Sequence, residues 1–516
     1  MSEQNSSDQY SIWIGLIYIF NLIVGTGALT LPAVFSKAGW ALGLSIILIL
    51  AFISFITITF VIEVMASANA IITWGHIQHR KRVCFSQDSS FNESESEVLQ
   101  NLGESGPSNS DSEDTPLVTP FSTSPDETNM TYRYYIIRDK IEMGQMASIF
   151  FNKFGTTLFY LCFAIYLYGD LSIYGAAVAK TLADVTCTYQ PMNLTCNDTI
   201  PDTELCWETF SLNRHDAYRM FLSTFVLLLG PFVFFNIQKT KYLQLLTSVM
   251  RWLAFTIMIV YALKNLIFRG AQGNPPAANV IGIPSLFGAC IYSFMCHHSL
   301  PALVAPIANK STLTRFLALD YFLIAFFYLL LALTGAFAFD HLDDLYTLDF
   351  SPRGSGDCSK SNNIFIILIE YFLALFPVFT LSTSFPIIAI TLRNNLQSLF
   401  LNEDLSYSCL RKFVLPILAI LPPYLIAMST KDLSILVGIT GSYAGAGIQY
   451  LIPTLLVYYA RRKTNKVIGL GVVNKFASPF SSNCWLVFVI AWAIACMILV
   501  SVNFMQIHLE LTGVNL

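Results

Sequence analysis

The chain has 516 residues, of which 54% are apolar, 14% aromatic and only 12% charged, and its formal net charge is −4. A soluble protein of this length needs more charged residues to cover its surface, so the composition indicates a polytopic membrane protein. The acidic excess lies in one polar segment and not over an extended surface, which excludes nucleic acid as an expected partner.

Apolar runs of about twenty residues predict eleven transmembrane helices, and hence an all-α membrane protein embedded in the lipid bilayer. The expected spans are residues 12–35, 41–70, 155–182, 217–237, 242–267, 284–308, 316–339, 362–392, 412–429, 433–460 and 483–506. The polar first residues lack the features of a removable signal peptide, so we expect the first span to act as the targeting signal. Loops on the same side of the membrane as the N-terminus hold about 18 Lys and Arg residues, and loops on the other side hold about six. Because Lys and Arg are in excess in cytosolic loops, this predicts a cytosolic N-terminus and an extracellular or lumenal C-terminus.

The longest polar segment, residues 71–140, divides the chain into regions. The N-terminus and the first two spans occupy residues 1–70, spans three to ten occupy 141–460, and 461–516 hold a cytosolic loop, the eleventh span and a short outer tail. The scarcity of apolar residues in segment 71–140 predicts that it is a disordered acidic cytosolic loop. Serines beside acidic residues suit phosphorylation and a cytosolic protein partner, but a spacer without a role fits equally well. Helical spacing over Arg138 to Gly155 predicts an amphipathic helix before the third span.

The loop at residues 184–216 carries cysteines and two acceptor triplets for N-linked glycans, which predicts an oxidising compartment. The candidate disulfide cysteines are Cys187, Cys196, Cys206 and, in another outer loop, Cys358, and the candidate glycosylation sites are Asn193 and Asn197. Four cysteines allow three pairings that the sequence does not separate. The plasma membrane and a lysosomal or endosomal membrane both agree with this pattern.

The first span contains the segment "NLIVGTGALTLP", in which Gly25 and Gly27 interrupt an apolar run. Glycine adopts non-helical backbone angles at little steric cost, so the helix is expected to break here. Unpaired backbone groups in hydrocarbon cost several kcal/mol each, and a break is tolerated only where protein or a ligand satisfies them. The N–H groups that begin the second half-helix suit a carboxylate. Close packing of an unbroken helix is the alternative explanation of these glycines.

The sixth span, "FGACIYSFMCHHSLPALVAP", is interrupted by two histidines, a serine and Pro301. Interruptions in spans one and six occupy equivalent positions if spans one to five and six to ten are copies of one unit. Because five is odd, the copies are inverted in the membrane. We therefore expect a 5+5 inverted-repeat transporter fold with one extra helix and a binding site near the midplane.

Four segments carry a resemblance to a known family. "FNLIVGTGALTLPAVFSKAGW", "YSFMCHHSLPALV", "STSFPIIAITLRNN" and "VGITGSYAGAGIQYLIPTLLVYY" resemble the amino acid and auxin permease family of the amino acid permease superfamily, closest to its transmembrane protein 104 group. The resemblance covers all eleven spans and implies cotransport of amino acids with protons or sodium ions. At matching positions, the substrate carboxylate would bind N–H groups of Gly25, Thr26, Gly27 and Ala28, and the ammonium would bind carbonyls near Phe294, Cys296 and His297.

Ionisable residues within spans are too costly to face lipid, and they are the candidates for proton coupling. His297 and His298 lie at the expected break, and a neutral imidazole near physiological pH suits a proton carrier, while a hydrogen-bonded structural histidine is the alternative. Asp170, in the third span, is a candidate proton carrier or an ion-pair partner of Arg251. Glu63 is likewise expected to face protein or water.

Hydroxyl and aromatic residues supply further candidates. Thr383 and Ser384 would surround a sodium ion together with carbonyls of the first break, although bonding back to their own helix explains them equally well. Tyr168 is a candidate to close over the substrate, and Tyr443, in the glycine-rich tenth span, is a candidate gate, with ordinary packing as the alternative for both. The spacing of Gly441 and Gly445 indicates close helix contact or a hinge.

The leading hypothesis is a secondary active transporter that couples a proton or sodium gradient to uptake of an amino acid or similar zwitterion by alternating access. The rival is a transporter-like membrane sensor or scaffold that binds amino acid without significant flux. The sequence contains no nucleotide-binding loop, nucleophile elbow or metal-ligand cluster, so we expect neither an enzyme nor a bound cofactor or metal.

Overall fold

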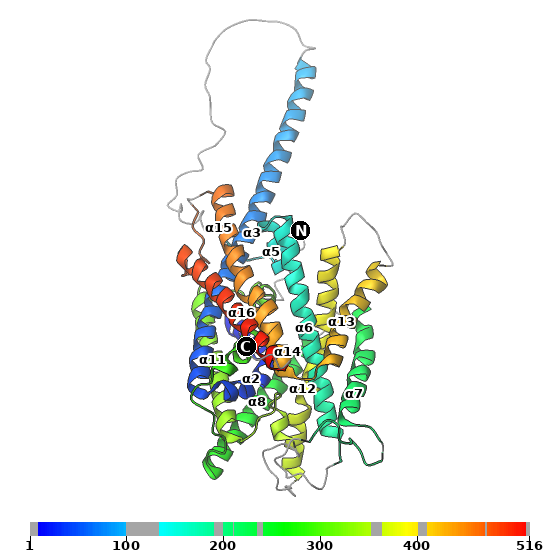
Figure 1. The fold of residues 1–516 in the computed structure, drawn as a ribbon. Helices are drawn as coiled ribbons and strands as arrows, with labels where there is room; N and C mark the ends of the chain where they lie inside the picture. The colour runs from blue at the N-terminus through cyan, green and yellow to red at the C-terminus, as the bar shows by residue number, and fades with distance from the viewer. Residues whose placement is uncertain are drawn as a thin grey trace.

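The computed structural model describes residues 9–99, 134–189, 200–209, 211–234, 241–351, 364–400, 410–469 and 472–511. This part of the chain is a bundle of helices without a β-strand (Figure 1). It holds nine helices that are long and apolar enough to cross a membrane, or ten if one bent pair counts as a single span. The prediction of a helical, polytopic membrane protein is confirmed.

The helices follow the expected spans in order. The long ones are α3 (Trp40–Leu99), α6 (Lys153–Thr186), α7 (Arg214–Leu229), α8 (Lys241–Arg269), α11 (Leu313–Ala338), α12 (Ile364–Phe400), α13 (Leu415–Ser429), α15 (Ile452–Val467) and α16 (Asn483–Leu511). The short ones are α1 (Ile12–Ile23), α2 (Thr26–Ala38), α5 (Met143–Phe150), α9 (Ile283–Ser293), α10 (Leu300–Val304) and α14 (Leu433–Thr440). Short 3₁₀ segments lie at Gly230–Phe234, Val280–Gly282 and Leu348–Phe350, and π-helical segments at Leu410–Val414, Gly441–Gly445 and Gly447–Leu451.

Helix α3 is longer than expected, because it continues past residue 70 to Leu99 and projects from the bundle in Figure 1. The first part of the segment expected to be disordered is therefore helical. Residues 100–133 lie outside the described residues, and there the disordered loop stays a prediction. The expected amphipathic helix before the third span is α5, which buries Met143, Met146 and Phe150 on one face.

The tenth span changes its helical type at the glycine-rich segment. It begins as α14, passes through the two π-helical segments that start at Gly441 and Gly447, and ends as α15. A Cβ atom on Gly288 of α9 would lie 2.7 Å from the Cα of Gly438, so the helices touch through their backbones. A Cβ atom on Gly441 would lie 2.0 Å from the Gly288 carbonyl oxygen, so close contact accounts for Gly441, whereas one on Gly438 would meet nothing within 4 Å.

Glu63 faces protein, as expected for a carboxylate at that depth. It is 5% exposed and accepts two hydrogen bonds from Arg461 of α15, at 2.7 and 2.8 Å. The backbone N–H of Ser478 donates to the same carboxylate at 2.9 Å. This cluster ties the segment that precedes α16 to α3, and so fixes the start of α16.

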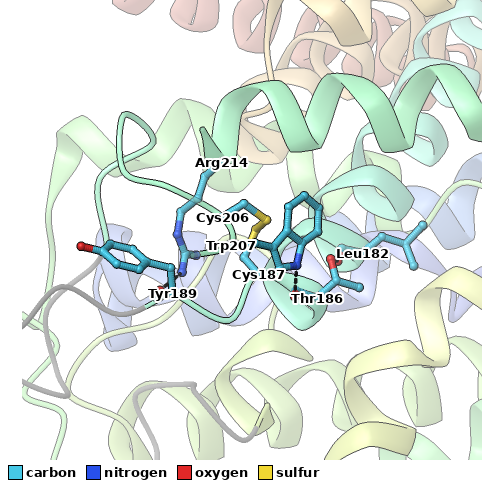
Figure 2. Close-up of a disulfide and its surroundings, with 7 residues drawn as sticks. All are labelled: Leu182, Thr186, Cys187, Tyr189, Cys206, Trp207 and Arg214. Atoms are coloured by element: carbon cyan, nitrogen blue, oxygen red, sulfur yellow. Dashed lines mark hydrogen bonds between the residues drawn. A yellow bond between two sulfur atoms is a disulfide. The ribbon is translucent and has the colours of Figure 1, made fainter. Parts of the chain in front are cut away.

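One end of the bundle is closed by a disulfide between Cys187, which follows α6, and Cys206, which precedes α7 (Figure 2). The Trp207 indole donates a hydrogen bond to the Thr186 carbonyl at 3.0 Å, and the Arg214 guanidinium donates one to the Tyr189 carbonyl at 3.3 Å. The other two candidate cysteines and both glycan sites, Cys196, Cys358, Asn193 and Asn197, lie outside the described residues and stay predictions.

The segment after α11 covers the same end of the bundle. The Asp344 carboxylate pairs with Lys180 of α6 and accepts a hydrogen bond from the Leu433 N–H at the start of α14, at 2.9 Å. The Tyr346 N–H donates to the Leu29 carbonyl of α2 at 2.9 Å. Helices α2, α6 and α14 are therefore joined at this end by one short loop.

Candidate binding site at two broken helices

The first span is broken at Val24 and Gly25. Helix α1 ends at Ile23, α2 begins at Thr26, and the two axes are bent by 54°. The Gly25 N–H donates back to the Ile23 carbonyl at 2.8 Å, whereas the first N–H groups of α2, those of Thr26 and Gly27, have no acceptor among the described residues. The interruption expected from the glycine pair is therefore present.

The segment expected to be the sixth span is interrupted between Ser293, the last residue of α9, and Leu300, the first of α10. The Phe294 N–H still closes the last turn of α9 on the Cys290 carbonyl at 2.9 Å, and the chain then runs in turns. The Leu300 N–H donates to the Cys296 carbonyl at 3.0 Å. The interruption expected from the histidine pair and the proline is also present.

The two breaks lie against each other. A Cβ atom on Gly27 would lie 2.5 Å from the Oγ of Ser293 and 2.7 Å from its Cα. The Tyr328 hydroxyl of α11 lies 2.9 Å from both the Ile23 and the Ser293 carbonyl oxygens. One buried hydroxyl therefore serves the carbonyl ends of α1 and α9 together.

The third span places a carboxylate beside the two breaks. Asp170 of α6 is 7% exposed and accepts a hydrogen bond from the hydroxyl of Tyr292, in the last turn of α9. One turn further along α6, Tyr174 lies near the Thr26 side chain. Helix α6 therefore faces α2 through Tyr174 and α9 through Asp170.

The predicted ion pair between Asp170 and Arg251 is wrong. The Arg251 guanidinium instead donates to the Asn21 carbonyl in the last turn of α1. The side chain of Arg251 lies beside the phenols of Tyr174 and Tyr328, and Tyr292 takes the place of a cationic partner at Asp170. Both ionisable side chains have protein partners as expected, but Arg251 binds the Asn21 carbonyl and Asp170 binds the Tyr292 hydroxyl.

The residues of the second break face different helices. His297 is fully buried, its Nε2 lies 2.9 Å from the Thr57 hydroxyl of α3, and its Nδ1 has no partner among the described residues. The His298 ring lies between Phe163 and Tyr166 of α6, with ring centroids 5.5 and 5.6 Å away. The two histidines thus point to opposite sides of the break.

The side chains of Phe294 and Cys296 pack against α11. The Phe294 ring lies 5.1 Å from that of Tyr328, centroid to centroid, and the Cys296 thiol lies 3.4 Å from the Tyr321 hydroxyl. Their side chains are fully buried. Both side chains are therefore held by α11 and do not face a space at the break.

Four predicted site residues are not brought to the breaks. The Tyr168 hydroxyl donates to the Leu418 carbonyl of α13 at 2.9 Å, and that of Tyr443 lies 2.8 Å from the Ser501 hydroxyl of α16. Thr383 and Ser384 of α12 donate to the Thr380 carbonyl of their own helix at 2.8 and 3.1 Å. The two tyrosines therefore pack against other helices, and Thr383 and Ser384 bond back to their own helix, as the alternative explanations proposed.

The described residues contain no group of three or more His, Cys, Asp and Glu side chains arranged to hold a metal ion. The polar groups that do meet the breaks come mostly from residues that sequence reasoning missed: Ser293, Tyr292 and Tyr328. Tyr292 and Ser293 are adjacent in an otherwise apolar run, Tyr328 lies alone in another, and hydroxyls of this kind give no signal in sequence beyond their own polarity. Thr57, which meets His297, is hidden in the same way.

A comparison with protein families gives a match to the family model for transmembrane amino acid transporter proteins, over residues 8–81 and 130–500. The chain is 52% identical over 509 residues to a transmembrane protein 104 homolog of Drosophila melanogaster, which covers 97% of this chain and 98% of the relative. It is 46% identical over 504 residues to transmembrane protein 104 of Homo sapiens, with 96% and 97% covered. A homolog in Dictyostelium discoideum is 34% identical over 525 residues, with 95% and 96% covered.

Proposed function

The chain belongs to the transmembrane amino acid transporter family, and from that premise we propose that it is a secondary active transporter of an amino acid or similar zwitterion. Beyond membership of the family, we propose a binding site and a transport mechanism. Substrate binds where the two broken helices meet, and the halves of the bundle move around it by alternating access. The energy comes from a proton or sodium gradient.

The observation that carries this proposal is the contact between the two breaks through Gly27 and Ser293. The first turn of α2 presents the free N–H groups of Thr26 and Gly27, with the partial positive charge of a helix start. The chain after α9 presents backbone carbonyls. A zwitterion carries a carboxylate for the first group and an ammonium for the second, so opposite partial charges at one place match its two ends.

The two breaks also support the proposed 5+5 inverted repeat. They fall in the first and sixth spans, which are equivalent positions of two five-helix units, and α16 then stands outside the repeat as an eleventh span. Close backbone contact of α9 with α14, through Gly288 and Gly438, gives the helices of the second unit a surface on which to slide or rock.

Asp170 and the histidines are the proposed carriers of a coupled proton. The Asp170 carboxylate lies on the helix that faces both breaks and is hydrogen-bonded to the last turn of α9, so a change in its charge reaches that break directly. His297 and His298 lie within the second break itself. The sodium alternative would require Thr383 and Ser384 to leave the Thr380 carbonyl of their own helix and turn toward the carbonyls of the first break.

We further propose that the N-terminus is cytosolic and that the disulfide end of the bundle is extracellular or lumenal. The disulfide between Cys187 and Cys206 supports this orientation, because disulfides persist in oxidising compartments. The excess of Lys and Arg in the opposite loops gives the same orientation. A plasma membrane and a lysosomal or endosomal membrane both meet these conditions.

The test is uptake of radiolabelled amino acids by the purified full chain in proteoliposomes, with an inward pH gradient, an inward sodium gradient, or neither. We expect at least one amino acid to accumulate several-fold more with one gradient than without. Empty liposomes and a Gly27→Ala variant serve as controls, since the added methyl group would occupy the space of Ser293. Binding without gradient-driven uptake of any amino acid would favour the rival sensor or scaffold, in which the same breaks hold the ligand.

A further inference from the structure

We propose that the Arg251 guanidinium is a built-in cation at the carbonyl end of α1, and that it replaces a bound sodium ion. The inference rests on the proposed function and narrows it. A carrier with a fixed positive charge at this position has no need of sodium, so its substrate uptake is independent of that ion.

The first step is the contact itself. Arg251 of α8 donates a hydrogen bond to the Asn21 carbonyl, in the last turn of α1 before the break. The end of a helix carries a partial negative charge from its unpaired carbonyls, and it is stabilised by a cation. An arginine side chain stays protonated in proteins and donates in a fixed planar geometry, so this cation is permanent.

The second step is how the guanidinium is held. The neighbouring Trp252 ring stacks on Phe20 of α1, with centroids 4.4 Å apart and planes within 14°. Arg251, Asn21 and Val24 line a narrow hollow together with aromatic side chains, and this hollow leaves no room for a water molecule. The charge is therefore fixed against the break, and a hydrated ion has no space beside it.

The third step is what surrounds the charge. The ionisable groups beside Arg251 are the phenols of Tyr174 from α6 and Tyr328 from α11, and both phenols are uncharged. Asp170 is bound to Tyr292 and forms no ion pair with Arg251. The partial negative charge at the carbonyl end of α1 therefore balances the guanidinium, as it would balance a bound metal ion.

The consequence for sodium follows from charge repulsion. A second cation on the same carbonyls would stand a few Å from the guanidinium. At the effective dielectric typical of such sites, this repulsion weakens cation binding by roughly a thousandfold. Sodium at ordinary concentrations would then leave these carbonyls unoccupied.

The deciding experiment does not require transport. Thermal unfolding of the purified full chain in detergent is measured in sodium chloride and in choline chloride of equal ionic strength. We expect the same midpoint in both salts for the natural chain and for Arg251→Lys. For Arg251→Met, which keeps an unbranched side chain but removes the charged guanidinium, we expect a lower midpoint in choline and a recovery of several degrees in sodium, because sodium now binds the folded state.

The matched control is Lys264→Met, which removes a positive charge from an exposed position of the same helix. We expect no sodium dependence for this variant. Stabilisation of the natural chain by sodium would overturn the inference, and so would an Arg251→Met variant whose midpoint is identical in both salts. If Arg251→Met does not fold, stabilisation of the natural chain or of Arg251→Lys by sodium would still overturn the inference.

Uptake assays separate this inference from the proposed function. Replacing sodium by choline should change uptake by less than twofold, and a tenfold loss would overturn the inference while leaving the transporter assignment intact. If no amino acid is taken up under any gradient, the proposed function fails, and the unfolding measurement still shows whether Arg251 stands in for sodium.

Discussion

Gly27 lies against Ser293 so closely that no side chain fits between them, since a Cβ atom on Gly27 would lie 2.7 Å from the Cα of Ser293. This contact joins the first turn of α2 to the last turn of α9. A side chain at position 27 would therefore push the two broken spans apart.

Gly27→Ala is expected to separate the two breaks. Overpacking of a buried contact typically costs about 1–3 kcal/mol, and the displaced N–H groups should weaken substrate binding at least tenfold. Gly75→Ala is the control, because a Cβ atom there would meet nothing within 4 Å. Thermal unfolding and ligand titration of the purified variants measure both effects. Unchanged binding by Gly27→Ala would show that the ligand does not use this contact.

Tyr328→Phe removes the hydroxyl that lies between the carbonyl oxygens of Ile23 and Ser293. We expect a loss of about 1–2 kcal/mol in stability, because two buried carbonyls share this donor. Substrate uptake should fall more than the folded fraction explains, since both breaks lose the same support. Tyr458→Phe, at a tyrosine that is 43% exposed, should change neither quantity. Equal behaviour of the two variants in unfolding and uptake assays would contradict the bridging role.

The breaks could be predicted from sequence because they depend on residue types with a direct backbone effect. Gly25, Gly27 and Pro301 favour or force non-helical geometry wherever they occur, and in an apolar span there are few other reasons for them. The positions of Glu63 and Asp170 away from lipid follow in the same way from the cost of burying charge in hydrocarbon. Local chemistry was sufficient in these cases.

The partners of those residues could not be predicted, because they depend on how helices rotate and pack. Asp170 avoids lipid as predicted, yet its partner is a tyrosine of α9 and not Arg251. Tyr168 is two residues from Asp170, which on a helix is a different face, so it meets α13 instead of the breaks. The long continuation of α3 to Leu99 was missed because its polar composition resembles that of a disordered segment.

Asp170→Asn is expected to uncouple uptake from a proton gradient. The amide keeps the shape of the side chain and an acceptor for the Tyr292 hydroxyl, but it cannot take up a proton. An inward pH gradient should therefore no longer accelerate uptake, while exchange of labelled for unlabelled substrate continues. Asp216→Asn, at an exposed position of α7, should retain full acceleration. Persistent acceleration in Asp170→Asn proteoliposomes would remove Asp170 from the coupling mechanism.

Asp344→Asn is expected to loosen the closed end of the bundle. Removing the carboxylate leaves Lys180, with a side chain only 19% exposed, without its partner, at a cost of about 1–3 kcal/mol. The fully buried Cys290 of α9 should then react with a maleimide several-fold faster, as mass spectrometry of its peptide can show. Lys431→Gln breaks an exposed pair, with side chains 37% and 45% exposed, and should cost less than about 1 kcal/mol. Equal labelling of Cys290 in both variants would exclude Asp344 from closing this end.

The disulfide and the proposed glycans test the orientation together. The Cys187–Cys206 bridge encloses both acceptor asparagines, Asn193 and Asn197, so these groups must share one side of the membrane. If that side is lumenal or extracellular, peptides from unreduced protein should contain the bridge, and N-glycosidase should lower the mass of the chain. The triplet at Asn309 lies after α10, in a loop predicted to be cytosolic, and should stay unmodified. Cys206→Ser should cost about 2–4 kcal/mol, because the open loop gains conformational freedom in the unfolded chain. Free thiols at both cysteines together with a glycan on Asn309 would reverse the orientation, and with it the assignment of the Lys180–Asp344 end as the outer one.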